Sequence, residues 1–195
     1  MNPEQCKALL KKRLSADLYR HTLGVAETAA GLALAYGADR DKAYLAGLVH
    51  DYAKELEPAL LRQKAKELRL SLDPVTLSEG HKLLHAPVGA ALAREELGIA
   101  DPEISSAIFY HTTGRAGMSV LEKVVYLADF IEPNRDFAAV EQLRELSRHS
   151  LDRAVLAAVD LTITLVLQRG LMLHPDSVAL RNDLIALIRK QGNGG

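Results

Sequence analysis

The chain has 195 residues, of which 48% are hydrophobic and 25% charged, and its formal net charge is −1. This length suits one domain with a sizeable core, and the composition argues against intrinsic disorder and against a basic nucleic-acid-binding surface. The single cysteine, Cys6, cannot form an internal disulfide or build a thiolate metal site by itself. Any metal bound here is therefore expected to have nitrogen and oxygen ligands.

Helix start and stop signals divide the chain into many segments. N-terminal signals with a polar cap or an early proline occur at Asn2-Pro3, Ser15, Glu57-Pro58, Asp101-Pro102 and the capping box Ser119 to Glu122. Gly37 is predicted to end the second helix. A third helix is predicted over residues 39–55 and a fourth to about Leu70, and the polar stretch SLDPVTLSEG (71–80) is predicted as a mobile loop.

The last third of the chain is also predicted to be helical. Residues 150–169 contain β-branched side chains, but their length and the Ser150 start favour a helix. Their apolar part, 154–167, is shorter than the ~20 residues that span a bilayer and contains Asp160, so it is interpreted as buried core. No stretch shows the sustained alternation of apolar and polar residues, with hairpin turns, that is typical of strands.

These patterns predict an all-α fold that forms one domain over residues 1–190, followed by a disordered tail at 191–195. The N-terminal sequence lacks the apolar segment of a secretory signal, which favours a cytoplasmic location.

The segment GLVHDYAKE (47–55) places His50 and Asp51 side by side in the C-terminal part of the third predicted helix. Adjacent helical residues differ by ~100° around the axis, so the pair converges on one ion only from a helix end or from a helix beside it. In VVYLADFIEPNR, Asp129 interrupts an apolar face, where a carboxylate costs several kcal/mol unless it is paired or binds a metal. His21 lies on another predicted helix.

The order His, His-Asp, Asp on separate helices resembles the HD-domain metal-dependent phosphohydrolases. Four segments are similar to the YqeK family of HD proteins, in that family's order: HDYAK, KLLHAPVGAALAREELG, AIFYHTTGRAGMS and LADFIEPNR. The resemblance covers roughly residues 15–137, and Ala116 stands where the family form HTSGRPGM has proline. It implies a single HD-domain helical bundle with a metal site at its centre.

The resemblance also implies a ligand set. One metal ion would be held by His21, His50, Asp51 and Asp129, and Asp51 would bridge to a second ion held by His85 and His111. If both ions are six-coordinate, each keeps open positions for water and phosphate oxygens. Imidazole and carboxylate ligands suit iron, with manganese, cobalt and nickel as alternatives, and argue against a closed structural zinc site.

The remaining histidines, His81, His149 and His174, are interpreted as ordinary core or surface residues. His81 stands four residues before His85 and shares its helical face if the segment is helical, so a supporting role beside the ligand is left open for it.

Three basic residues each accompany a predicted ligand. Lys54, Arg115 and Arg135 are hypothesised to neutralise a polyphosphate. The predicted catalytic residues are Asp51, Lys54 and Arg115, and the predicted substrate contacts are Lys54, Thr112, Gly114, Arg115, Asn134 and Arg135. Phe109, Tyr110 and Phe130 are the candidates for base stacking.

The activity implied by the resemblance is symmetrical hydrolysis of diadenosine tetraphosphate to two nucleoside diphosphates at a two-iron centre. An activated water suffices for this chemistry, and no serine elbow of the G-x-S-x-G type occurs. Two alternatives are an HD-domain nucleotidase acting on mononucleotides and a nucleotide-sensing module without turnover. The expected partner is a small nucleotide rather than a nucleic acid or a membrane, and a homodimer is left open.

Overall fold

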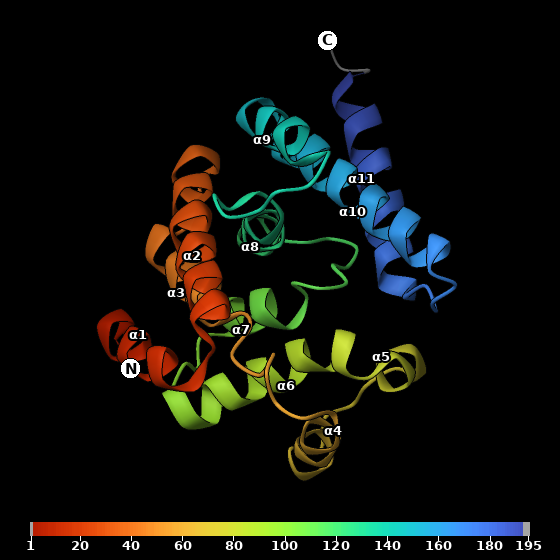
Figure 1. The fold of residues 1–195 in the computed structure, drawn as a ribbon. Helices are drawn as coiled ribbons and strands as arrows, with labels where there is room; N and C mark the ends of the chain where they lie inside the picture. Colours follow the sequence, from red (N-terminus) through yellow and green to blue (C-terminus); the bar gives the residue numbers. More distant parts are fainter. Residues whose placement is uncertain (1, 193–195) are drawn as a thin grey trace.

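The structure is a computed structural model that describes residues 2–192, and in this range it contains α-helices and no strand. The predicted all-α class is therefore confirmed. Figure 1 shows α8 near the middle of the molecule, between α2 and α10. In chain order they are α1 Pro3–Arg13, α2 Ala16–Tyr36, α3 Arg40–Val49, α4 Pro58–Glu67, α5 Pro74–Glu79, α6 His81–Leu97, α7 Pro102–Phe109, α8 Val120–Ile131, α9 Val140–His149, α10 Leu151–Gln168 and α11 Pro175–Gly192.

Most predicted helix ends are present with their capping interactions. Asn2 and Ser119 both form capping boxes, and the Asp101 carboxylate accepts hydrogen bonds from two backbone amides of α7. Ser15 caps α2, which ends at Gly37 in the left-handed conformation (φ 73°). Local chemistry thus fixes where these helices begin and end.

The core is centred on α8. Every residue of this helix from Leu121 to Ala128 is buried, and α8 packs against α2, α3, α7, α9 and α10. Figure 1 shows α8 between α2 on one side and α10 on the other. Because α8 is enclosed by other helices, a polar side chain near its C-terminal end is brought into the middle of the molecule.

The third helix ends earlier than predicted. It stops at Val49, and residues 50–55 form successive turns in which Tyr52 N–H bonds to Val49 and Lys54 N–H bonds to Asp51. His50 and Asp51 therefore leave a helix end, which is one of the two arrangements that allow adjacent residues to converge.

The prediction of a loop over 71–80 is wrong in part, because residues 74–79 form the short helix α5. The Asp73 carboxylate accepts hydrogen bonds from Val75 N–H and Thr76 N–H, and Pro74 occupies the first helical position. This start signal within the polar stretch explains the helix.

The predicted burial of 154–167 is confirmed only in its first half. Ala154, Val155, Ala158 and Val159 are fully buried, whereas further along α10 Leu165 is 44% exposed and Leu167 63%. The described helices are all too short or too polar to cross a bilayer. Helix α11 extends through Gly192, and positions 193–195 of the predicted tail lie outside the described residues.

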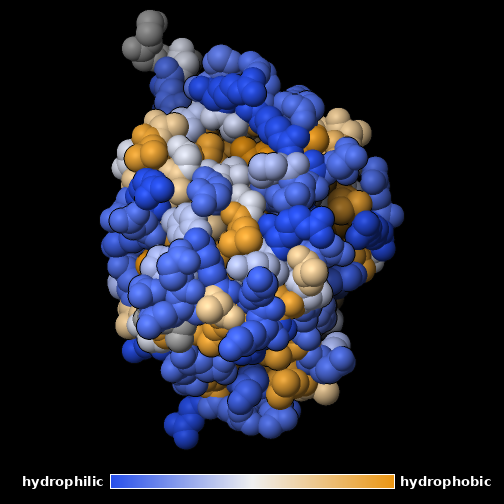
Figure 2. Space-filling model, turned by 60° about the vertical axis from the view of Figure 1, so that its left-hand side comes forward, coloured by the Kyte–Doolittle hydropathy of each residue, from blue (hydrophilic) through white to orange (hydrophobic). Residues whose placement is uncertain are grey.

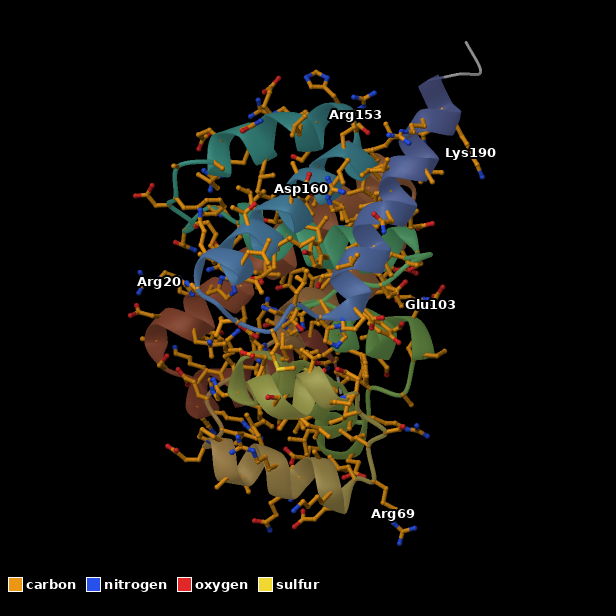
Figure 3. All side chains as sticks on the ribbon, turned by 90° about the vertical axis from the view of Figure 1, so that its right-hand side faces the viewer. Arg20, Arg69, Glu103, Arg153, Asp160 and Lys190 are labelled. Carbon is orange, nitrogen blue, oxygen red and sulfur yellow. The ribbon has the colours of Figure 1, made fainter. Side chains whose placement is uncertain are left out.

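Charged side chains project from the outer surface of the bundle (Figure 3). Arg69, Glu103 and Lys190 point away from the bundle in Figure 3. On the face in Figure 2, hydrophobic residues form separate spots among hydrophilic ones. The apolar surface on this face is therefore divided rather than gathered into one large patch.

Candidate metal centre

The fold brings together all six predicted metal ligands. His21 comes from α2, His85 from α6 and Asp129 from α8, while His50, Asp51 and His111 follow the ends of α3 and α7. Figure 1 shows these elements meeting in the middle of the molecule. The potential ligand atoms form two groups, and within each group they lie within 4.8 Å of one another. The first group is His21, His50 and Asp51, and the second is Asp51, His85 and His111.

All four imidazoles use Nδ1 for a hydrogen bond to a protein acceptor. His50 Nδ1 lies 2.7 Å from the Gly47 carbonyl, His85 Nδ1 3.0 Å from that of His81, and His111 Nδ1 2.7 Å from that of Ile108. His21 Nδ1 lies 3.1 Å from Glu132 Oε1. An acceptor at Nδ1 places a proton on that nitrogen, so in each neutral imidazole Nε2 carries the lone pair and faces the centre.

The Nε2 atoms of His21 and His50 lack a donor for their lone pairs, whereas Lys54 Nζ lies 3.2 Å from His85 Nε2. Nε2 of His21 and His50 is buried without a hydrogen-bond partner, and Nε2 of His85 lies 3.2 Å from Nε2 of His111. Lone pairs and carboxylates converging in a buried space repel one another unless a cation lies between them. Nitrogen and oxygen ligands without sulfur match the predicted transition-metal site, so the residues present fit such ions.

Asp51 lies between the two ligand groups. Its Oδ2 is 3.3 Å from His50 Nε2 and 3.9 Å from His21 Nε2. Its Oδ1 is 3.1 Å from His85 Nε2 and 3.4 Å from His111 Nε2. One carboxylate oxygen thus faces each group, which is the arrangement that a bridging ligand requires.

Asp129 completes the first group, because its Oδ1 lies 2.9 Å from His21 Nε2 and 3.9 Å from His50 Nε2. Burial would raise the pKa of this carboxyl group, but its contact with the His21 ring and the charge of Arg135 lower it well below the ordinary value. Burial likewise opposes ionisation of Asp51, yet His50 and the other imidazoles hold its pKa well below the ordinary value. Both groups are carboxylates at neutral pH.

The histidines of the second group are neutral at the same pH. Burial lowers the pKa of His85 to about 4. Burial also lowers the pKa of His111. Burial acts in the same direction on His50, but the charge of Asp51 overcomes it and raises the pKa of this imidazole. Neutral His85 and His111 are in the form that ligates a metal.

Two of the three predicted cations lie at the rim of this centre. Lys54 Nζ is 3.4 Å from Asp51 Oδ1 and 3.2 Å from His85 Nε2, and its side chain is 38% exposed. Arg135 donates from Nε to the Asp129 carbonyl at 2.6 Å and from a terminal nitrogen to the Asp129 carboxylate. Both cations contact a predicted ligand and also reach solvent.

The third cation, Arg115, is held by a buried carboxylate. Its Nε and a terminal nitrogen donate to Glu122 at 2.8 and 3.0 Å, and Glu122 is 1% exposed. The N–H of Gly114, a predicted substrate contact, donates to the Tyr110 carbonyl at 2.8 Å. Thr112 is half-buried and lines a cavity of about 190 Å³. The loop is thus braced by bonds that the sequence did not indicate.

Gly114 also has a packing role. Its φ is +63°, and a Cβ there would overlap the Leu180 side chain of α11, with Leu180 Cγ 3.3 Å away. Only glycine combines this backbone conformation with so close an approach.

The remaining histidines have ordinary partners. His149 is exposed and pairs with Glu145 at 2.9 Å, and the buried His174 lies 2.9 Å from Asp73. His81 Nε2 is 2.7 Å from the Lys54 carbonyl. Because the His81 carbonyl accepts from His85, this residue supports the turn that carries Lys54 and the ligand His85, but its own ring does not reach the centre.

Glu132 belongs to the site and escaped the sequence interpretation. It is 1% exposed, bonds to His21, and accepts hydrogen bonds from Asn134 N and Nδ2 at 2.8 Å each. Asn134, predicted as a substrate contact, thus holds Glu132. The signal was present in FIEPNR, since Glu132 follows Asp129 by three positions, one helical turn.

Comparison with known proteins agrees with this geometry. The HD domain model matches residues 18–134. The chain is 44% identical to the symmetrical bis(5'-nucleosyl)-tetraphosphatase of Halalkalibacterium halodurans over 185 residues, covering 95% of this chain and 98% of that protein. The corresponding Bacillus subtilis protein is 39% identical over 191 residues, covering 95% and 99%.

A crystal structure of a predicted HD superfamily hydrolase involved in NAD metabolism, from Clostridium acetobutylicum, superposes with a TM-score of 0.91 at 38% identity. The match covers 95% of this chain and 98% of that chain. The chain is therefore an HD-domain protein. Within that class it belongs to the family of the symmetrical bis(5'-nucleosyl)-tetraphosphatases, and the resemblance read from the sequence is confirmed.

Proposed function

We propose that the chain hydrolyses diadenosine tetraphosphate and related dinucleoside polyphosphates symmetrically, to two nucleoside diphosphates. The observation that carries this proposal is the Asp51 carboxylate, whose two oxygens face separate groups of imidazole lone pairs. Relatives of 44% and 39% identity over nearly the whole chain bear the name of this activity.

The proposed centre holds two metal ions, with iron first and manganese, cobalt and nickel as alternatives. His21, His50, Asp51 and Asp129 would hold one ion, and Asp51, His85 and His111 the other. When bound, such ions lower the pKa of a water molecule and offset negative charge on phosphate oxygens.

The chain's own residues supply orientation and charge. The ionised Asp51 and Asp129 hold ligand oxygens toward the centre without needing to lose a proton at neutral pH. The exposed end of Lys54 lies where it can donate to a phosphate oxygen beside the second group. Arg135 can contact a phosphate on the side of Asp129, because its side chain is 40% exposed.

A groove beside Asp129 gives room for one nucleoside. It has a volume of about 650 Å³, and its charged lining residues are Asp129 and Arg135. Its apolar walls are formed by Phe130, Phe137, Leu161 and Leu165. A nucleotide placed with its phosphates at Arg135 would lay its base against these side chains, which suits an aromatic ring that stacks or packs on apolar surface.

The test of the proposed function is the position of bond cleavage. In ¹⁸O-labelled water, diadenosine tetraphosphate should give two ADP molecules, one of which carries the label on its terminal phosphate. A chelator should abolish the reaction. ATP and AMP as initial products would contradict the symmetrical assignment even if the metal centre were correct.

Both alternatives predict other outcomes in the same assay. A nucleotidase would release phosphate from mononucleotides faster than it cleaves the dinucleotide, and a sensing module would bind nucleotide without forming product. Elemental analysis of protein purified without oxygen measures the metal: about two ions per chain are expected, and iron should predominate. The cytoplasmic location stays a prediction.

A further inference from the structure

His21 differs from the other three imidazoles in how it is oriented. His50, His85 and His111 bond through Nδ1 to backbone carbonyls of Gly47, His81 and Ile108, which no side-chain substitution removes. His21 Nδ1 instead bonds to the Glu132 carboxylate. The orientation of this one ligand therefore depends on a side chain outside the predicted ligand set.

Both the carboxylate and the backbone carbonyl of Glu132 are held by hydrogen bonds. Its Oε1 faces His21, and its Oε2 accepts from the backbone N–H and the side-chain amide of Asn134. Arg144 of α9 donates to the carbonyls of Ile131, Glu132 and Arg135 at 3.1, 2.8 and 3.2 Å. The buried carboxylate thus has a donor at each oxygen and a braced backbone.

Gly24 provides the space for this carboxylate. It lies in α2, three residues after His21, and a Cβ at this position would overlap Glu132 Oε2 and lie 3.2 Å from Glu132 Cδ and 3.3 Å from Asn134 Nδ2. A glycine inside a helix costs roughly 1 kcal/mol relative to alanine. The close approach of Glu132 accounts for glycine at this position.

We propose that Glu132 is a positioning residue that holds His21 with Nδ1 protonated and Nε2 free for the first metal ion, and that Gly24 is required for this contact. A carboxylate at the far nitrogen of a metal-bound histidine fixes the ring and increases its basicity, and loss of such a partner weakens metal binding roughly 10- to 100-fold. The inference rests on the proposed two-metal centre but not on the identity of the substrate.

The experiment uses three variants of the full chain. Glu132→Gln keeps the size of the side chain but replaces one carboxylate oxygen by an NH2 donor, which must face either the Asn134 donors or the Nδ1–H of His21. Gly24→Ala displaces the carboxylate without changing its charge. Gly31→Ala is the matched control, because Gly31 lies in the same helix and a Cβ there meets nothing within 4 Å.

The measurement is metal affinity by competition with a chromophoric chelator, on protein whose folding is checked by circular dichroism. Glu132→Gln and Gly24→Ala should both raise the dissociation constant of one ion roughly 10- to 100-fold and leave the other ion within a few-fold. Gly31→Ala should bind both ions as the parent chain does.

The outcomes separate the inference from the proposed function. If folded Glu132→Gln and Gly24→Ala bind both ions with the parent affinity, the positioning role is wrong and Glu132 is only a packing residue. If the parent chain itself binds one ion or none, the two-metal centre fails instead. A variant that does not fold is replaced by Asn134→Ala, which removes one donor to Glu132 and should weaken the same ion to a smaller extent.

Discussion

Removal of Arg115 should destabilise the fold rather than act only on substrate binding. The guanidinium makes two hydrogen bonds to Glu122, whose side chain is 1% exposed, and Arg115→Ala leaves this carboxylate buried with only Ser106 and Ser119 as donors. Breaking a buried pair from one side costs ~3–5 kcal/mol. Because the Arg115 side chain is 37% exposed, water replaces part of the lost contact, and about 2 kcal/mol is expected.

The assay is urea unfolding of the purified chain at pH 7, with the melting temperature as a second readout. A loss of about 2 kcal/mol corresponds to a fall of ~4–8 °C for a chain of this size. Arg20→Ala is the control, because the Arg20 pair with Asp17 has side chains that are 62% and 92% exposed. If Arg115→Ala unfolds at the same urea concentration as Arg20→Ala, the structural role assigned to Arg115 is wrong.

The same pair predicts a pH dependence. Burial would raise the pKa of Glu122, but the bonds from Arg115, Ser106 and Ser119 lower it below the ordinary value of 4.5. A depressed folded pKa gives stability that is present above the ordinary value and is lost as the pH falls through the folded pKa. The difference in stability between the parent chain and Glu122→Gln should therefore be constant from pH 7 to about 5 and shrink below pH 4.5.

The remaining predictions concern the centre and the groove. Asp51→Ala should lose activity that excess metal does not restore, because this residue faces both ligand groups. The activity of His85→Ala should return in part with excess metal. Equal rescue of both variants would contradict the bridging assignment. Leu165→Glu, which places a charge in the proposed nucleoside groove, should raise KM for the dinucleotide about tenfold or more. Leu167→Glu, on the same helix but outside the groove lining, should leave KM unchanged. If the two variants have equal KM, the groove does not hold the nucleoside.

Part of the site could be predicted from where its residues stand in the sequence, while the full ligand set, including His85 and His111, came from the family resemblance. Asp129 interrupts an apolar helix, and His50 with Asp51 ends another, so the sequence alone indicates carboxylate and imidazole in a buried setting. The helix starts were predictable for a similar reason, since capping depends on residues within one turn. Features that depend on local chemistry are visible in the sequence.

The roles of Arg115 and Glu132 could not be read in the same way, because each depends on tertiary contacts. Glu122 was visible as the capping-box residue of Ser119, but its contact with Arg115 follows from the path of the loop between α7 and α8. Likewise, Glu132 meets His21 only because α2 and the end of α8 lie together. A basic or acidic residue beside a motif shows where charge is, but not which partner it has.

The second half of α10 illustrates the opposite error. Its leucines were interpreted as core because they form an apolar run, yet Leu165 and Leu167 are 44% and 63% exposed. Hydrophobicity predicts that a side chain gains from burial, but whether a neighbouring element covers it depends on the packing. Here the second half of α10 is left exposed, and one of its exposed residues, Leu165, lines the proposed groove.

The two halves of the centre should differ in how they respond to mutation. The imidazoles of the second group, His85 and His111, are oriented by backbone carbonyls, so substitutions nearby weaken that ion only when they replace a ligand or move the backbone. In the first group His21 is oriented by the Glu132 side chain, and Asp129 is bonded by Arg135. Variants in residues 132–135 can therefore change KM and kcat through the first ion without contacting substrate. A rise in KM for Arg135→Ala identifies a phosphate contact only if both ions are still bound at parent affinity.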